Sequence, residues 1–380
     1  FSEPYDLPNA IAYCETCAAI GMALWAHRMF LITGNARYLD VLELELYNGI
    51  PAGLSLSGDL FFYDNVLSSR GTRERVPWFD CSCCPTNIVR FVPQIPSMVI
   101  SSDAVERAIF INVPMACEAD VELATPQPTD APKVKVTVES QYPWSGSVKV
   151  KVDPGAASPQ RFKLHLRRPG WCVTDPQVTP LWSAAPDDEM TFNDETGFLV
   201  IDRTWESGDE LQIELPMPVQ RVHAHPLVHQ NAGRVALKRG PVVFCLEEVD
   251  HPGLRVHNLV LPGHATLNAT FDGSFLGVGS LRVAAEGLVS SIDIAPEGAS
   301  AQGEPSTVSP AASVIGGGKD ADSAAGGGGT STMVAGTAVD TSSTSANGSP
   351  NGAVNITAIP YAFWNHRGKG EMVVWMLEDA

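Results

Sequence analysis

Two short cysteine clusters constrain this chain more than any other feature. The first is Cys14-Glu15-Thr16-Cys17 and the second is Cys81-Ser82-Cys83-Cys84-Pro85. Five of the eight cysteines fall within these two segments. Thiolate sulfur and carboxylate oxygen are both ligands of Zn²⁺, and a closed zinc site needs four ligands. The clusters therefore predict a metal-bound thiolate, either structural or nucleophilic.

Local geometry decides whether these side chains can meet. Glu15 and Cys17 are two residues apart, so their side chains diverge by about 200° on an ideal helix. They can converge on one ion only near a helix start or in an irregular turn. Cys83 and Cys84 stand just before Pro85, and proline is favoured as the first residue of a helix. A helix start at Pro85 would lower the pKa of both thiols, and a metal would lower it further.

Other interpretations of the cysteines stay open at this level. A structural four-cysteine zinc knot, a disulfide pair and buried thiols that only pack are all compatible with the spacing. A thioredoxin-like redox role is weaker, because no strand-like sequence leads into the first cluster. The cysteines outside the predicted site are expected to be packing thiols, namely Cys14, Cys117, Cys172 and Cys245.

Charge and hydropathy exclude several classes of partner. The formal net charge of −18 argues against nucleic acid and anionic membrane surfaces. The sequence has no uninterrupted apolar run long enough to span a bilayer, so no membrane segment is expected. Adjacent free thiols suit a reducing compartment, which predicts a cytoplasmic location. The chain begins at Phe1 and not at Met, which leaves room for a removed leader.

Residues 1–100 are predicted to be mainly helical. Asn9 can cap a helix that runs from Ala10 to about Thr33, with Gly34 as its stop. A second helix is expected from about Ala36 to Asn48, and a third should begin at Pro85 and break near Pro93 or Pro96. A short hairpin is expected around Gly58-Asp59.

From about Val99 the apolar pattern changes to a period of two. Val134, Val136 and Val138 alternate with polar residues, and similar runs recur with turn signals between them. This pattern indicates antiparallel sandwiches, and we predict one over 101–218 and a second over 219–380. Residues from about 299 to 352 are rich in Gly, Ser, Ala and Thr. Such a segment is predicted to be a disordered insert in the second unit.

Several motifs occur in a fixed order along the chain. They are the two cysteine clusters, Tyr5-Asp6-Leu7-Pro8-Asn9, Tyr47-Asn48-Gly49, Leu166-Arg167-Arg168-Pro169-Gly170-Trp171, Gly233-Arg234-Val235-Ala236-Leu237 and Arg239-Gly240-Pro241. In this combination the chain resembles glycoside hydrolase family 127, which includes β-L-arabinofuranosidases. The resemblance covers nearly all of the chain except the predicted insert.

The resemblance implies a fold and a site. The fold would be the C-terminal part of an (α/α)₆ barrel, over residues 1–100, followed by the two β-sandwich domains. Zn²⁺ would be held by Glu15, Cys17, Cys83 and Cys84. Cys83 would be the nucleophile of a retaining glycoside hydrolase, in the place of the usual carboxylate.

Two further residues match family positions that line the sugar pocket. Glu43 is one, with a solvated helix face as the alternative interpretation. Tyr63 is the other, and we expect it to pack in the core unless Phe61 and Phe62 take the buried side. His27 is expected to be a satisfied packing residue, and His223, His225 and His229 are expected at the surface. The tryptophans Trp144, Trp171 and Trp205 are expected in the core rather than on a sugar.

One expected residue is missing. The acid/base glutamate of the family would lie just before Phe1, so the resemblance implies the C-terminal portion of an enzyme that does not turn over substrate by itself. Two other hypotheses remain: a non-catalytic, zinc-stabilised glycan-binding protein, and a redox or metal-storage protein. The expected partner is an arabinose-containing oligosaccharide or glycoconjugate, with a homodimer as an open option.

Overall fold

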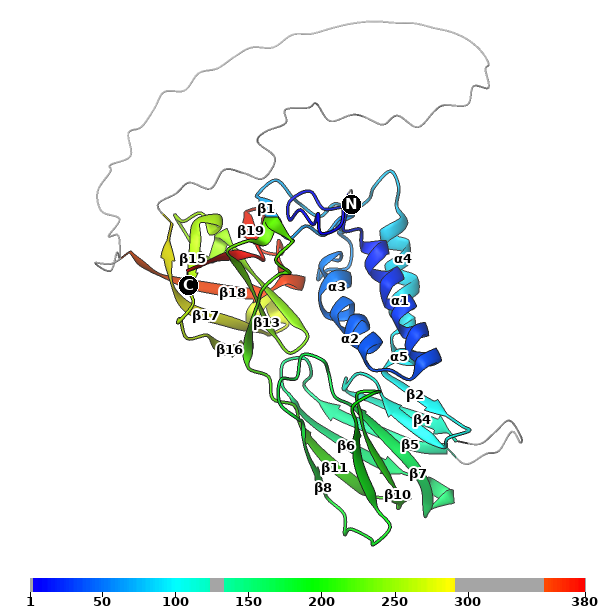
Figure 1. The fold of residues 1–380 in the computed structure, drawn as a ribbon. Coiled ribbons are helices and arrows are strands. Elements are labelled where there is room, and N and C mark those ends of the chain that lie inside the picture. The colour runs from blue at the N-terminus through cyan, green and yellow to red at the C-terminus, as the bar shows by residue number, and fades with distance from the viewer. Residues whose placement is uncertain (1–2, 124–132, 291–351, 380) are drawn as a thin grey trace, which may run out of the picture. The chain divides into compact units, whose positions relative to one another are not determined.

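The computed structural model describes residues 3–123, 133–290 and 352–379. Helices come first and strands follow, so the chain is of mixed α and β class, as predicted (Figure 1). The predicted insert at 299–352 lies, apart from Gly352, outside the described residues.

The helical segment holds two long pieces that are close to the predicted ones. The first, α1 (Thr16–Thr33), ends at Gly34, whose left-handed backbone (φ 64°) confirms the predicted stop. A π-helical turn, η1 (Glu45–Gly49), continues α2 directly into α3, and a 3₁₀ turn, η2 (Val92–Gln94), follows α4. The remaining helices are α2 (Arg37–Leu44), α3 (Ile50–Ala52), α4 (Cys83–Phe91) and α5 (Pro96–Val99).

Two predicted helix starts were wrong. Helix α1 begins at Thr16 and not at Ala10, because the buried Asn9 amide donates a hydrogen bond to Asn231 Oδ1 (2.8 Å) instead of capping a helix. Helix α4 begins at Cys83, before the proline at which we expected it. The hairpin predicted around Gly58-Asp59 is present, with an antiparallel bridge between Leu54 and Phe61.

The helices pack through one face of α1. Ile20, Ala23, Ala26 and Phe30 recur at helical spacing and are buried against α2 and α4. The same helix is 18 residues long with a mean hydropathy of 1.2, and 28% of it is buried. By length and composition it could cross a membrane, a test that core helices and signal sequences also pass. Closure of these helices into an (α/α)₆ barrel stays a prediction.

The first β unit consists of two five-stranded sheets around one core. In β5 (Lys133–Ser140) and β6 (Ser147–Asp153) the valines are buried in the core and alternate with polar residues on the other face, as the period-two pattern predicted. One sheet has the order β2 (Ile100–Asp103), β3 (Ala108–Ile111), β7 (Gln160–Arg167), β10 (Phe198–Trp205), β9 (Glu189–Asn193). The other has the order β4 (Cys117–Glu122), β5, β6, β11 (Asp209–Glu214), β8 (Gln177–Pro180).

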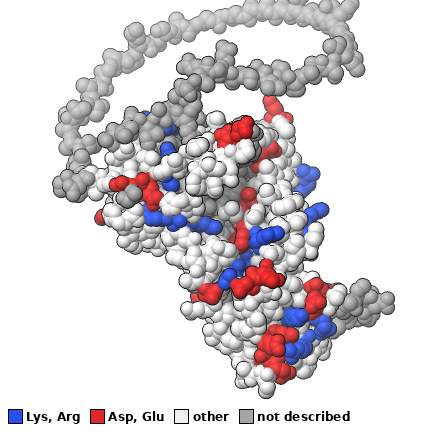
Figure 2. All heavy atoms as spheres, viewed as in Figure 1, with Lys and Arg blue, Asp and Glu red and all other residues white. Residues whose placement is uncertain are grey.

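The solvent face of β4, β5 and β6 carries charges of both signs. Lys133 pairs with Glu122 (3.1 Å) and Lys135 pairs with Glu118 (2.8 Å) across neighbouring strands. Figure 2 shows acidic and basic side chains interspersed over this part of the molecule. The face therefore offers no large patch of one sign, although the whole chain is acidic.

The second β unit differs from the predicted two-sheet sandwich. Its strands form a single ten-stranded sheet, in which β13, β14, β18, β17, β15 and β20 pair in a closed circuit around one apolar core. Strand β1 (Ser68–Arg70), from the helical segment, pairs with β19 of this sheet. The other strands are β12 (Val219–Val222), β13 (Arg234–Arg239), β14 (Val242–Glu247), β15 (Leu259–Pro262), β16 (Asn268–Asp272), β17 (Ser280–Val289), β18 (Ala353–Pro360), β19 (Glu371–Val373) and β20 (Met376–Asp379).

Candidate metal centre

Both cysteine clusters fold so that four ligand-type side chains converge. Glu15 stands before α1 with an extended backbone (φ −65°, ψ 137°), and Cys17 lies in the first turn of the helix. This is the helix start that their two-residue spacing requires. Cys83 and Cys84 open α4, which packs beside α1 (Figure 1). One ligand atom from each of the four side chains lies within 4.8 Å of all the others.

The distances within this cluster match a tetrahedral metal site. The Sγ atom of Cys84 lies 3.7 Å from Cys17 Sγ and 3.8 Å from Cys83 Sγ. Ligands at the usual Zn–S distance of about 2.3 Å would place two sulfurs about 3.8 Å apart at tetrahedral angles. All eight cysteines are free, and these separations are far longer than a disulfide bond of about 2.05 Å. The residues present therefore fit Zn²⁺ in both chemistry and spacing.

The fourth side chain of the cluster is a carboxylate and not a fourth cysteine. Cys83 Sγ donates to Glu15 Oε1 at 3.3 Å. Cys14 and Cys81 belong to the same sequence clusters but lie outside the converging set, and Cys81 is exposed. The arrangement is therefore not the four-cysteine knot that the spacing alone allowed. Among the residues that the structure describes, this is the one such cluster of three or more metal-binding side chains.

The pKa values of Cys83 and Cys84 are raised, whereas we expected the helix start to lower them. Burial is the main cause that raises the pKa of Cys84, and hydrogen bonding with Cys17 and Cys83 adds to it. Burial and hydrogen bonds to Cys17 and Glu15 also raise the pKa of Cys83. The protein matrix by itself thus favours the thiol form, and the thiolate needs a cation for its stabilisation.

Two phenols stand beside the cluster. Phe61 and Phe62 are buried, which leaves the Tyr63 side chain on the accessible side, as our condition for a pocket role required. The Tyr63 hydroxyl is hydrogen-bonded to the Tyr13 hydroxyl at 2.6 Å. That bond, together with burial and the nearby charges of Glu15 and Cys83, raises the pKa of Tyr63. Sequence reasoning assigned no role to Tyr13, although it lies two residues before a predicted ligand.

Glu43 is not brought to this cluster as an accessible sugar ligand. Its carboxylate is 1% exposed and accepts hydrogen bonds from Arg167 Nη2 (2.7 Å), Trp171 Nε1 (2.9 Å) and the Tyr142 hydroxyl (2.5 Å). With these donors in place it is neither free to bind hydroxyl groups nor the solvated residue that we considered as the alternative. Sequence reasoning missed its partners, although Arg167 and Trp171 lie in a motif that we had noted.

In the part of the chain that the structure describes, no histidine belongs to the candidate metal cluster. His223, His225 and His229 are exposed, as predicted, and His223 Nε2 contacts Glu378 Oε2 at 2.6 Å. His27 is not the satisfied packing residue that we expected, because its buried Nε2 has no hydrogen-bond partner. Burial lowers the pKa of His27, so its ring is neutral at physiological pH. Trp171 and Trp205 are core residues, as predicted.

Comparison with known families covers almost the whole chain. The model of the β-L-arabinofuranosidase GH127 catalytic domain matches residues 1–97. Those of the GH127 middle domain and the glycoside hydrolase family 127 C-terminal domain match residues 108–217 and 219–377. A curated relative is the non-reducing end β-L-arabinofuranosidase of Bifidobacterium longum subsp. longum. It is 33% identical over 267 residues, which are 67% of this chain and 38% of that protein.

Solved structures agree with these matches. A GH127 β-L-arabinofuranosidase from Geobacillus stearothermophilus T6 is 33% identical, with a TM-score of 0.75 over 99% of this chain and 51% of its own length. A second GH127 β-arabinofuranosidase is 31% identical, also with a TM-score of 0.75, over 100% of this chain and 51% of its own. The chain thus spans about half the length of these structures. It belongs to glycoside hydrolase family 127.

Proposed function

We propose that this chain contributes the zinc–thiolate centre of a retaining glycoside hydrolase that releases terminal L-arabinofuranose or a related sugar. The observation that carries the proposal is the convergence of Glu15, Cys17, Cys83 and Cys84 at tetrahedral spacing. Family membership and the activities named for the relatives support the sugar class. Bound there, Zn²⁺ would supply the positive charge that keeps the surrounding thiolates deprotonated near neutral pH.

Cys83 is the proposed nucleophile because it is the more accessible of the two adjacent cysteines. Its neighbour Cys84 is fully buried. Its sulfur attacks the anomeric carbon, a C–S bond forms, and the bond from that carbon to the leaving-group oxygen breaks. Water then attacks the same carbon, the C–S bond breaks, and the sulfur returns to the site. Two inversions at one carbon give net retention of configuration.

Tyr63 and Tyr13 are proposed to orient the sugar. Their hydroxyls form one hydrogen-bonded pair beside the cluster, so a sugar hydroxyl that joins the pair finds both a donor and an acceptor. Such contacts position the anomeric carbon against the sulfur without taking part in bond breaking.

Proton delivery to the leaving group is the step to which we assign no residue among 1–380. The resemblance implies that the family's acid/base glutamate lies outside residues 1–380, and general acid catalysis contributes roughly 10²–10⁴-fold to rate. We therefore propose that residues 1–380 alone bind the metal but do not turn over a natural glycoside. An activated aryl glycoside needs little acid assistance, so its sugar should still be transferred to Cys83.

The expected difference between natural and activated aryl glycosides provides the test. The zinc-loaded chain is incubated with an aryl β-L-arabinofuranoside that has a good leaving group, and the protein mass is recorded. We expect a pentosyl adduct on Cys83, its loss in Cys83→Ser, and its persistence in Cys81→Ser, which removes an exposed cysteine outside the cluster. Sugar binding without an adduct would contradict the proposal and favour the non-catalytic glycan-binding alternative.

A further inference from the structure

A cavity of about 470 Å³, lined by both polar and apolar side chains, lies where the helical segment meets the second β unit. One wall comes from the hairpin at 54–61 and the neighbouring residues 74–75, and the other from residues 365–369, before β19. Its lining includes Ser57, Glu74, Arg75, Asn365, His366 and Lys369. None of these residues belongs to the metal cluster.

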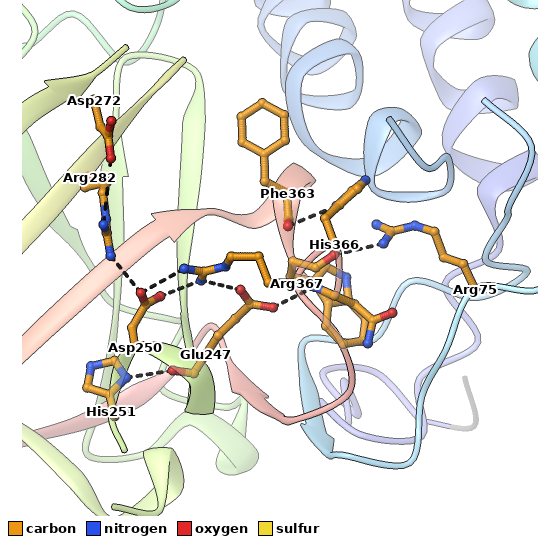
Figure 3. A network of polar contacts seen from close by, with 11 residues as sticks. Arg75, Glu247, Asp250, His251, Asp272, Arg282, Phe363, His366 and Arg367 are labelled. Atoms are coloured by element: carbon orange, nitrogen blue, oxygen red, sulfur yellow. Dashed lines mark hydrogen bonds and ion pairs between the residues drawn. The ribbon is translucent and has the colours of Figure 1, made fainter. Parts of the chain in front are cut away.

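Arg75 is the unusual member of this lining. It is 5% exposed, and its guanidinium donates to the backbone oxygens of Trp364 (2.9 Å) and Ala52 (2.8 Å). Both partners are neutral, and the buried Nε has no hydrogen-bond partner. In the described part of the chain no carboxylate lies within ion-pair distance of this arginine. Figure 3 shows its guanidinium pointing toward the segment that carries Phe363 and His366.

A second arginine nearby shows how this fold normally neutralises such a charge. Arg367 Nη2 contacts Glu247 at 2.6 Å and Asp250 at 2.5 Å, and Asp250 also pairs with Arg282 at 2.6 Å (Figure 3). Asp250 is therefore shared between two arginines, and Glu247, which is paired with Arg367, acts on Arg75 only through its longer-range charge. Burial of an arginine without a counter-ion is unfavourable, and burial lowers the pKa of Arg75 to about 10. The Phe62 ring, whose centroid lies 4.4 Å from the Arg75 Cζ atom, stabilises the cation but supplies no negative charge.

The rest of the lining adds no compensating negative charge. Lys369 pairs with Glu74 at 2.6 Å, and both side chains are more than half exposed. His366 is neutral, because burial lowers its pKa, its Nδ1 donates to Phe363 O (3.0 Å) and its Nε2 accepts from the Leu56 amide (3.1 Å). Two cations and one carboxylate leave the cavity with one net positive charge, which suits a ligand with a single anionic group.

The cavity and the metal cluster lie at opposite ends of one extended segment. Leu60 lines the cavity, whereas the Tyr63 carbonyl accepts from the Thr16 amide (2.9 Å) and Asp64 forms a bridge with Glu15. Five extended residues span about 13 Å between their first and last Cα atoms. That span is short enough for one oligosaccharide to reach both places.

We infer that this cavity binds the carboxylate of a uronic acid residue in the glycan whose terminal sugar faces Cys83. The assignment to a glycan rests on the proposed function, whereas the anion site itself rests on Arg75 and its surroundings. A carboxylate would supply the counter-charge that the guanidinium lacks, and Lys369 would hold it at the rim.

Direct binding tests this without any turnover. Galacturonate, neutral galactose and inorganic phosphate are titrated into the full chain by calorimetry or by ligand-observed NMR. We expect galacturonate to bind at least about tenfold more tightly than galactose, the effect of one charge-assisted hydrogen bond. Arg75→Gln should abolish that preference. Lys369→Gln should reduce the preference for galacturonate several-fold. Because this change alters only a half-exposed side chain, it tests the cavity even if Arg75→Gln does not fold.

A matched control is available on the first β unit. Lys133 pairs with Glu122 and is 54% exposed, close to the 55% of Lys369, so Lys133→Gln should leave galacturonate binding unchanged. Equal binding of galacturonate and galactose, or an unchanged preference in both cavity variants, would overturn the inference. Binding of phosphate without galacturonate would overturn its assignment to a glycan. A missing Cys83 adduct with galacturonate binding intact would count against the proposed function alone.

Discussion

The carboxylates of Glu15 and Glu43 differ in burial and in hydrogen bonding. Both residues were predicted to belong to the active site, Glu15 as a metal ligand and Glu43 in the sugar pocket. Glu15 is partly exposed before α1 and accepts a hydrogen bond from the Cys83 thiol (3.3 Å). Glu43 is 1% exposed and is held by an arginine, a tryptophan and a tyrosine. The first carboxylate therefore has lone pairs left for a metal, whereas those of the second are filled.

The contrast shows what separates a reactive carboxylate from a structural one. Glu43 lies near the end of α2, and its donors Arg167 and Trp171 come from the first β unit, so the ion pair joins helices to strands. Burial by itself would lower the pKa of Arg167, but Glu43 and Asp40 outweigh it and hold that pKa above its ordinary value. A polar group that is fully paired in this way contributes to stability, not to chemistry.

The largest effect is expected at the metal cluster. Replacing two of the four ligands, in Cys83→Ser with Cys84→Ser, should reduce zinc content from one ion per chain to none and remove zinc-linked stabilisation on the order of 10 kcal/mol. Metal analysis after purification under reducing conditions and melting with and without a chelator measure both effects. Cys81→Ser should keep one ion. An unchanged zinc content in the double variant would eliminate the proposed site.

A smaller but still large effect is expected at Glu43. The isosteric change Glu43→Gln leaves the buried Arg167 without its main counter-ion, which should lower the free energy of unfolding by about 3–5 kcal/mol. Urea unfolding measures it, and zinc content should not change.

The control for this change is Glu118→Gln. Glu118 pairs with Lys135 on the exposed face of the first β unit, so the urea midpoint should stay in place. If Glu43→Gln instead left stability unchanged and weakened sugar binding, our assignment of Glu43 to a structural role would be wrong.

A third carboxylate, Glu45, lies between these extremes. Burial raises its pKa to about 7 from 4.5, and a Cβ at Gly49 would collide with its carboxylate. The folded state thus keeps this proton to a higher pH than the unfolded state. The stability contribution is present below pH 4.5, falls as pH rises to about 7 and stays lost above that.

Glu45→Gln should therefore stabilise the chain at pH 8 by roughly 2–3 kcal/mol and have little effect at pH 4. Urea unfolding at the two pH values measures this difference. A variant less stable than the parent at pH 8 would show that the ionised Glu45 carboxylate has a partner. Glu45 would then be a paired structural carboxylate like Glu43.

Local sequence patterns predicted those features that depend on neighbours in the chain. Gly34 as the stop of α1 and the alternation of β5 and β6 follow from backbone preference and period-two patterning. The cysteine clusters by themselves predicted a metal-bound thiolate but left other interpretations open. The set of four candidate ligands came from the family resemblance.

Features that depend on distant contacts could not be predicted in this way. Asn9 failed as a cap because its partner is Asn231, and the role of Glu43 depends on Arg167. The closed circuit of the second sheet needs the β13–β20 and β15–β20 pairings. No local pattern indicates which strands will be neighbours, so these results required the structure.

X-ray absorption at the zinc edge tests the central claim most directly. The zinc-loaded chain should show three sulfurs at about 2.3 Å and one oxygen at about 2.0 Å, from Cys17, Cys83, Cys84 and Glu15. Glu15→Gln should lower the affinity for zinc and keep the three sulfurs. Four sulfurs in the parent chain would contradict this account, since Cys14 or Cys81 would then replace Glu15 in a purely structural zinc knot.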